Sequence, residues 1–139
     1  MDMDLESEEY LYLNSLCMRV FDQLGYGFNE KVYQKALARE LQYRYPTVET
    51  EFCIPQFYIT TTGERIQLTV LKVDIWIPAA KILIELKTVS RELNKYSKEW
   101  NQLQRYSKIL NCSSKYLINF STEKVYIISE TEENNNNNS

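Results

Sequence analysis

The chain has 139 residues, 44% of them hydrophobic, which predicts one domain with a core of its own. It contains no histidine, and this excludes catalysis by Ser-His or Cys-His pairs and zinc sites built on imidazole. The net charge of -3 arises at the ends, because residues 1–9 and 129–139 hold eight of the 19 acids and no base. Residues 10–128 hold 16 bases against 11 acids. We expect a basic domain over residues 10–128 between a disordered acidic leader (1–9) and a disordered acidic, asparagine-rich tail (129–139).

Hydrophobic periodicity predicts two helices at the start of this domain, over residues 8–24 and 29–44, with a Gly-Tyr-Gly segment between them. On the second helix, Glu30 shares a stripe with Tyr33 and Leu37 that should face the core. A carboxylate on such a stripe needs a partner or a metal ion. Alternatively, Glu30 lies in the first turn of the helix, where the macrodipole favours an acid that need not be buried.

Three strands are predicted next, over residues 51–58, 66–77 and 81–88. A turn at residues 78–80 folds the last two strands into a hairpin, which brings Asp74 towards Glu85. Since side chains alternate along a strand, Glu85 and Lys87 project together. Two carboxylates beside a lysine suit a hard divalent cation, with an amine left to act on water. In the alternative interpretation, Asp74 caps the hairpin and Glu85 pairs with Lys87 on a solvated face.

A third helix is predicted over residues 93–110. Its Gln102 and Tyr106 lie four residues apart, so both can point into one polar cleft, although Tyr106 could also be a core aromatic and Gln102 its polar neighbour. The segment that begins at Lys87 is basic and lies where a phosphate backbone would have to pass, or else it is a solvated helix face with ion pairs. The residues predicted to bind nucleic acid are Arg91, Lys95, Lys98, Arg105 and Lys108.

Two short strands, over residues 115–120 and 124–128, complete an α-α-β-β-β-α-β-β order, which predicts an α/β fold around a mixed sheet. No apolar stretch approaches the roughly 18 residues that span a bilayer, and the acidic start is unlike a signal peptide. We therefore expect a soluble intracellular protein, in the cytoplasm or nucleus, with no membrane partner. The three cysteines form no C-x-x-C pair, so we expect reduced thiols and no zinc site.

Several motifs resemble those of a known family. Residues 27–33, Gly-Phe-Asn-Glu-Lys-Val-Tyr, match the motif that names the GxxExxY protein family. Asp74 with Glu85 and Lys87 resembles the D...ExK signature of the PD-(D/E)XK nuclease superfamily, to which that family is assigned, with Val73 where the name has proline. Residues 102–106, Gln-Leu-Gln-Arg-Tyr, resemble the QxxxY motif of its RecB-like and lambda-exonuclease-like branches. The likeness spans roughly residues 16–128.

The resemblance implies a restriction-endonuclease-like α-β-β-β-α-β core with an extra N-terminal helix. It also implies that Asp74 and Glu85 ligate Mg²⁺ or Mn²⁺, with the Leu86 carbonyl as a further ligand and Glu30 completing the acidic cluster. By the same resemblance, Lys87 would orient or activate the attacking water. Gln102 and Tyr106 would position the lysine or the phosphate.

These inferences predict a metal-dependent nuclease that hydrolyses DNA, with RNA as an open alternative. The preference for ends or single strands rests on the QxxxY resemblance alone. One alternative is a module that keeps the fold and binds nucleic acid or protein without cutting. Another is a homo-oligomeric accessory subunit, because tyrosine, present 11 times, is enriched at interfaces.

Overall fold

The structure is a computed structural model that describes residues 7–131. The helices are α1 (Glu8–Leu24), α2 (Glu30–Leu41) and α3 (Lys98–Leu110). The strands are β1 (Glu49–Ile59), β2 (Arg65–Ile77), β3 (Ile82–Lys87), β4 (Ser114–Phe120) and β5 (Val125–Thr131). These elements confirm the predicted α/β class and element order.

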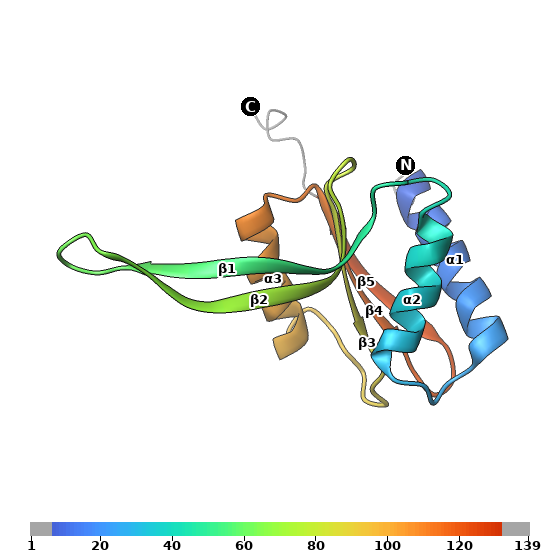
Figure 1. The fold of residues 1–139 in the computed structure, drawn as a ribbon. Coiled ribbons are helices and arrows are strands. Elements are labelled where there is room, and N and C mark those ends of the chain that lie inside the picture. The colour runs from blue at the N-terminus through green and yellow to red at the C-terminus, as the bar shows by residue number, and fades with distance from the viewer. Residues whose placement is uncertain (1–6, 132–139) are drawn as a thin grey trace, which may run out of the picture.

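The five strands form one mixed sheet in the order β1-β2-β3-β4-β5. Strands β3 and β4 are parallel because α3 connects them, and the other neighbouring pairs are antiparallel. Helices α1 and α2 lie on one face of the sheet and α3 lies on the other (Figure 1). Alternation along β3 serves both faces, since Ile84 and Leu86 pack under α1 and α2 while Leu83 packs under α3. Position 85 therefore lies on the α3 face.

The tyrosine of the Gly-x-x-Glu-x-x-Tyr motif, Tyr33, is a structural residue. It is fully buried, and its ring stacks on Phe120 with a centroid separation of 4.4 Å. Its hydroxyl donates to the Gly25 carbonyl oxygen at 2.5 Å and accepts from the Phe28 amide at 3.4 Å. Gly27 between them has a φ of 122°, which favours glycine. Tyr33 thus fixes the loop that sets the start of α2, where Glu30 lies.

Strands β1 and β2 continue past the body of the molecule as a two-stranded ribbon (Figure 1). Their register shifts between Gln56 and Phe57. Ile66, Leu68 and Val70 of the ribbon are exposed. The ribbon is therefore stabilised by the pairing of its two strands and not by a core.

Several boundaries differ from those that the sequence predicts. Glu8 and Glu9, predicted in the leader, belong to α1, because the Ser7 hydroxyl accepts from the Tyr10 amide and caps this helix. Residues 129–131, predicted in the tail, pair with β4 as the end of β5. The rest of the leader and tail, residues 1–6 and 132–139, lie outside the described residues.

The third helix begins at Lys98 and not near residue 93. The Asn94 side chain accepts from the Tyr96 amide, and the Ser97 hydroxyl accepts from the Asn94 amide. These local bonds form a turn that competes with helix. Helix α2 likewise ends at Leu41, several residues before its predicted end. Within residues 7–131, none of the helices is long and apolar enough to cross a membrane.

We expect Tyr33→Phe to lower the free energy of unfolding by about 1 kcal/mol, because the Gly25 carbonyl loses a buried donor. Tyr33→Ala should lower it by about 3–5 kcal/mol through the cavity next to Phe120. Urea unfolding followed by circular dichroism measures both, with Tyr58→Phe on the exposed ribbon as a control. Equal stability of Tyr33→Phe and wild type would show that the hydroxyl does not hold the loop.

Candidate active site

The site lies where strands β2 and β3 separate. Their pairing ends at Ile75 and Ile84, and the next polar contacts are made by side chains. The Asp74 amide donates to Glu85 Oε1 at 2.8 Å, and the Leu86 amide donates to Asp74 Oδ2 at 2.7 Å. Two carboxylates thus take the place of the backbone carbonyls that would continue the ladder. The predicted return of Asp74 towards Glu85 is confirmed.

Strand β2 is irregular at Asp74. Val73 packs on the α3 side of the sheet, whereas Ile75, two residues later, packs under α1 and α2. In a regular strand these side chains would share a face. On the neighbouring strand Glu51 has a φ of 52°, and the register of β1 and β2 passes over Glu51 and Asp74 without pairing them. Irregularities of this kind are frequent beside active sites, where they re-aim a side chain.

The acids of the site hold their protons more tightly than usual. Burial, and then the charge of Asp74, raise the pKa of Glu85 to about 8, and its side chain is 6% exposed. Burial also raises the pKa of Asp74, which the Leu86 amide and Lys87 partly offset. Burial raises the pKa of Glu30 in the same direction, against the charge of Lys87. An added cation would relieve this accumulation of acids.

The predicted cluster of three acids is only partly assembled. Among residues 7–131, no group of three Asp, Glu, His or Cys side chains is close enough to hold a metal ion. Glu30 lies in the first turn of α2, where the Asn29 side chain caps the helix, as the alternative interpretation had it. It acts on Glu85 through its charge. Asp74 and Glu85, in contrast, are joined by hydrogen bonds between β2 and β3.

Lys87 opens into a cavity of about 580 Å³ on the α3 side. Gln102 lines the same cavity and is hydrogen-bonded to Tyr106. Burial and the charge of Glu85 raise the pKa of Tyr106. The charge effect indicates that the Tyr106 hydroxyl lies near the acid pair. The structure thus brings Lys87, Gln102 and Tyr106 to one side of the acids.

The five basic residues predicted to bind nucleic acid have different neighbours. Lys98 and Arg105 line the cavity with Gln102, because positions i, i+4 and i+7 share a helix face. Lys108 is exposed outside the cavity, and Lys95 lies over the Trp100 ring, 5.5 Å from its centroid.

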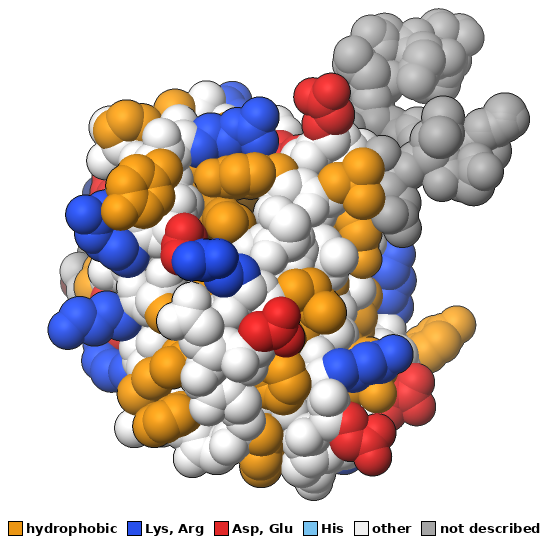
Figure 2. All heavy atoms as spheres, turned by 90° about the vertical axis from the view of Figure 1, so that its right-hand side faces the viewer, with side chains coloured by type: hydrophobic (Ala, Val, Ile, Leu, Met, Phe, Trp, Pro, Cys, Tyr) orange, Lys and Arg blue, Asp and Glu red, His pale blue; other side chains and the backbone are white. Residues whose placement is uncertain are grey.

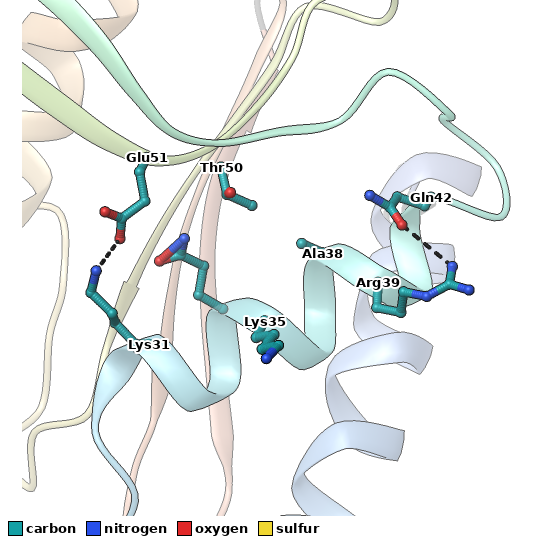
Figure 3. A pocket seen from close by; sticks show the side chains of 8 residues that line it. Lys31, Lys35, Ala38, Arg39, Gln42, Thr50 and Glu51 are labelled. Atoms are coloured by element: carbon teal, nitrogen blue, oxygen red, sulfur yellow. Dashed lines mark hydrogen bonds and ion pairs between the residues drawn. The ribbon is translucent and has the colours of Figure 1, made fainter.

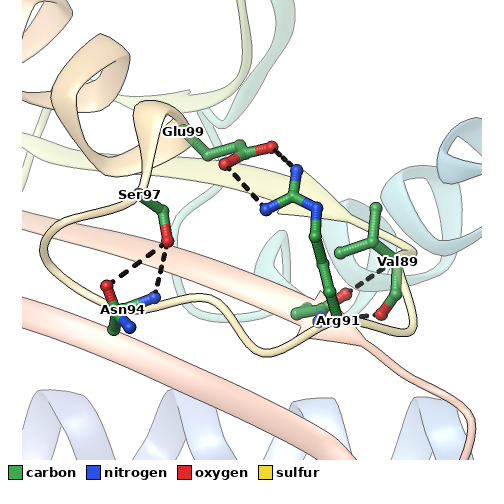
Figure 4. Close-up of polar contacts among 6 residues, drawn as sticks. Val89, Arg91, Asn94, Ser97 and Glu99 are labelled. Atoms are coloured by element: carbon green, nitrogen blue, oxygen red, sulfur yellow. Dashed lines mark hydrogen bonds and ion pairs between the residues drawn. The ribbon is translucent and has the colours of Figure 1, made fainter.

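The fifth basic residue, Arg91, is bound by Glu99, a contact that the sequence analysis did not predict. Both of its terminal nitrogens contact the buried carboxylate of Glu99 (Figure 4). These bonds hold the pKa of Glu99 below its ordinary value. Arg91 therefore fixes the loop before α3 and is occupied there.

Asn119 and Glu51 were also missed. The Asn119 side chain accepts from the Val89 amide and donates to the Val89 carbonyl, each at 3.0 Å, and so holds the chain just after Lys87. A polar residue in the apolar β4 sequence could have signalled this role. Glu51, which raises the pKa of Asp74 through its charge, lies on a strand that pairs with β2 only in the fold. The sequence around it carries no such signal.

Residues 8–129 match the family model of the PD-(D/E)XK nuclease superfamily. Among solved structures, the chain is similar to the crystal structure of SSO0001, with a TM-score of 0.56 and 18% identity. The match covers 78% of this chain and 52% of that one, so the chain spans about half the length of SSO0001, and the likeness shows the fold alone. No curated protein sequence matches the chain. The predicted restriction-endonuclease-like fold is confirmed.

The free energy of unfolding should depend on pH through Glu85. Its pKa is about 8 in the folded chain, against an ordinary value of 4.5. Between these values the folded chain keeps a proton that the unfolded chain has released, so stability falls as pH rises towards 8. In EDTA we expect the melting temperature to decrease from pH 5 to pH 8, and to decrease less in Glu85→Gln. Thermal unfolding followed by fluorescence measures this.

Mn²⁺ should raise the melting temperature more at pH 8 than at pH 6, because it binds ionised carboxylates. Glu64→Gln, in the turn of the exposed ribbon, is the matched control and should behave as wild type. Parallel pH profiles for wild type and Glu85→Gln would contradict the assignment of the titrating group.

Proposed function

Because this chain belongs to the PD-(D/E)XK nuclease superfamily, we propose that it is a metal-dependent nuclease that hydrolyses phosphodiester bonds in DNA. The observation that carries the proposal is the contact between Asp74 and Glu85 at the opening of β2 and β3, with Lys87 on the same strand. Glu30 and Tyr33 add the GxxExxY motif, so the same proposal includes membership of that family.

The residues present fit a hard divalent ion. Carboxylate and carbonyl oxygens are the ligands that Mg²⁺ and Mn²⁺ prefer. The Leu86 amide points at Asp74, and since the amide and carbonyl of a strand residue share an edge, the Leu86 carbonyl belongs to the same opening. We assign Asp74, Glu85 and the Leu86 carbonyl to the ion, and Glu30 adds a further negative charge from α2.

When bound, the ion would polarise the phosphate and lower the pKa of the attacking water. Lys87 orients that water and balances charge that develops on the phosphate oxygens. Gln102 and Tyr106 position Lys87 or the phosphate. Lys98 and Arg105 hold neighbouring phosphates along the cavity on the α3 side. Glu85 must lose its proton before it can serve as a ligand, so activity rises with pH.

A second candidate is a module that binds nucleic acid or protein without cutting. One oxygen each of Asp74 and Glu85 is already bonded to a backbone amide, and this arrangement would also suit acids that serve only to join two strands. The exposed ribbon would then supply a contact to a protein, such as a second copy of the chain.

With Mg²⁺ or Mn²⁺, the purified chain should cleave linear, nicked, closed-circular or single-stranded DNA, and EDTA should stop the reaction. Glu85→Gln, Asp74→Asn and Lys87→Ala should each lower kcat by about 100-fold or more, because the first two remove a ligand of the ion and the third removes the positive charge beside the phosphate. Lys124→Ala, an exposed lysine on the β4–β5 turn, is the control and should act as wild type. Gel assays across the four substrates measure the rates and the substrate preference.

A folded wild type that binds DNA but cleaves none of these substrates, nor RNA, with either ion would contradict the nuclease and favour the binding module. Full activity in Glu85→Gln would show that the catalytic pair has been wrongly assigned.

A further inference from the structure

A second cavity, of about 480 Å³, lies between α2 and the start of β1 (Figure 3). We propose that this α2–β1 groove binds single-stranded nucleic acid and leads it to Asp74 and Glu85. The second half of this statement rests on the proposed nuclease function. The first half, binding in the groove, stands on the groove itself.

The groove is positively charged along α2. Lys31, Lys35 and Arg39 line it at positions i, i+4 and i+8, so they share a helix face with a rise of about 6 Å between successive residues. Within residues 7–131, Lys35 and Arg39 have no acidic side chain at ion-pair distance, and the sole acid in the lining is Glu51. Figure 2, which faces the α1–α2 side of the molecule, shows basic and some acidic side chains interspersed with hydrophobic ones there. Evenly spaced cations suit the successive phosphates of an extended strand.

Gln34 provides an independent indication of a ligand. Its side chain lines the groove, is 6% exposed and makes no hydrogen bond to any residue in the range 7–131. Buried side-chain amides are hydrogen-bonded in the large majority of proteins. An amide offers a donor and an acceptor together, which is the pattern needed to pair with the edge of a nucleobase.

The far end of the groove has a stacking surface. The Arg39 guanidinium lies 5.0 Å from the centroid of the Tyr43 ring, and that ring is 74% exposed. Unpaired bases stack on such planar groups regardless of their sequence. The cavity has the size of a small-ligand site, about 300–1,000 Å³, which accommodates a nucleotide and not a duplex. These features favour a single strand.

The groove adjoins the acid pair at Glu51. The Glu51 carboxylate binds Lys31 at 3.0 Å (Figure 3) and Lys72 at 3.5 Å. Glu51 and Asp74 are the two residues that the pairing of β1 with β2 passes over, and the charge of Glu51 acts on Asp74. A strand that follows Arg39, Lys35 and Lys31 therefore arrives beside Asp74.

The test is fluorescence anisotropy of a labelled single-stranded oligonucleotide with the full chain, in EDTA so that nothing is cut. The double variant Lys35→Ala/Arg39→Ala should weaken binding at least tenfold and reduce the slope of log K against log salt by about 1.4, about 0.7 for each lost phosphate contact. Gln34→Leu should weaken binding while keeping the salt slope. Arg65→Ala/Lys124→Ala removes the same charge elsewhere and should bind as wild type.

Unlabelled single strand should displace the probe at lower concentration than duplex or polyglutamate of equal charge. Wild-type affinity in Lys35→Ala/Arg39→Ala would overturn the proposal. Equal displacement by duplex or by polyglutamate would also overturn it, since the groove would then be a site for duplex or for any polyanion.

Cleavage assays with Mg²⁺ or Mn²⁺ separate this proposal from the nuclease. If wild type cleaves and the groove double variant has wild-type KM and kcat, the result contradicts binding in the groove and supports the nuclease activity. If neither wild type nor any variant cleaves but the double variant loses binding, the result contradicts the nuclease activity and supports the groove as a binding site. If both hold, the double variant should raise KM for single strands more than it lowers kcat. Equal melting temperatures show that all variants are folded.

Discussion

The structure depends on the way in which β2 and β3 part. An antiparallel ladder that simply stopped would leave backbone amides without partners, and buried amides without partners are costly. Here the Glu85 side chain accepts from the Asp74 amide and the Asp74 side chain accepts from the Leu86 amide, so the same two contacts close the ladder and open the site. The acids are therefore held in place by the sheet and need no loop to position them. Burial raises the pKa values of both acids, and the amide hydrogen bonds offset only part of that rise.

Where β2 and β3 separate, the acid pair has different neighbours on the α3 side and on the α2 side of the sheet. On the α3 side it meets Lys87, Gln102 and the cavity lined by Lys98 and Arg105. On the α2 side it meets Glu51 and the groove of Lys35 and Arg39. Loop contacts support the first side, because Asn119 holds Val89 and Arg91 holds Glu99.

The sequence predicted those parts of the site that depend on local order. The turn at residues 78–80 determined how far Asp74 lies from Glu85 along the hairpin, and helix spacing placed Gln102 beside Tyr106. Resemblance to a family supplied the roles. Tertiary contacts decided the rest: the pairing of β1 with β2 brings the charge of Glu51 near Asp74, and Glu99 binds Arg91. The late start of α3 came from side-chain bonds at Asn94 and Ser97, which compete with helix and which periodicity does not register.

The ribbon of β1 and β2 determines how readily strands of other chains can add to the edge of the sheet. Strand β1 is the outer strand of the sheet, and an open edge next to exposed Ile66 and Leu68 would ordinarily invite other chains to add strands. Pro55, which has no amide hydrogen, and the register shift after Gln56 interrupt the row of donors and acceptors along that edge. The ribbon thus exposes an apolar face on an edge that is poorly suited to the addition of further strands.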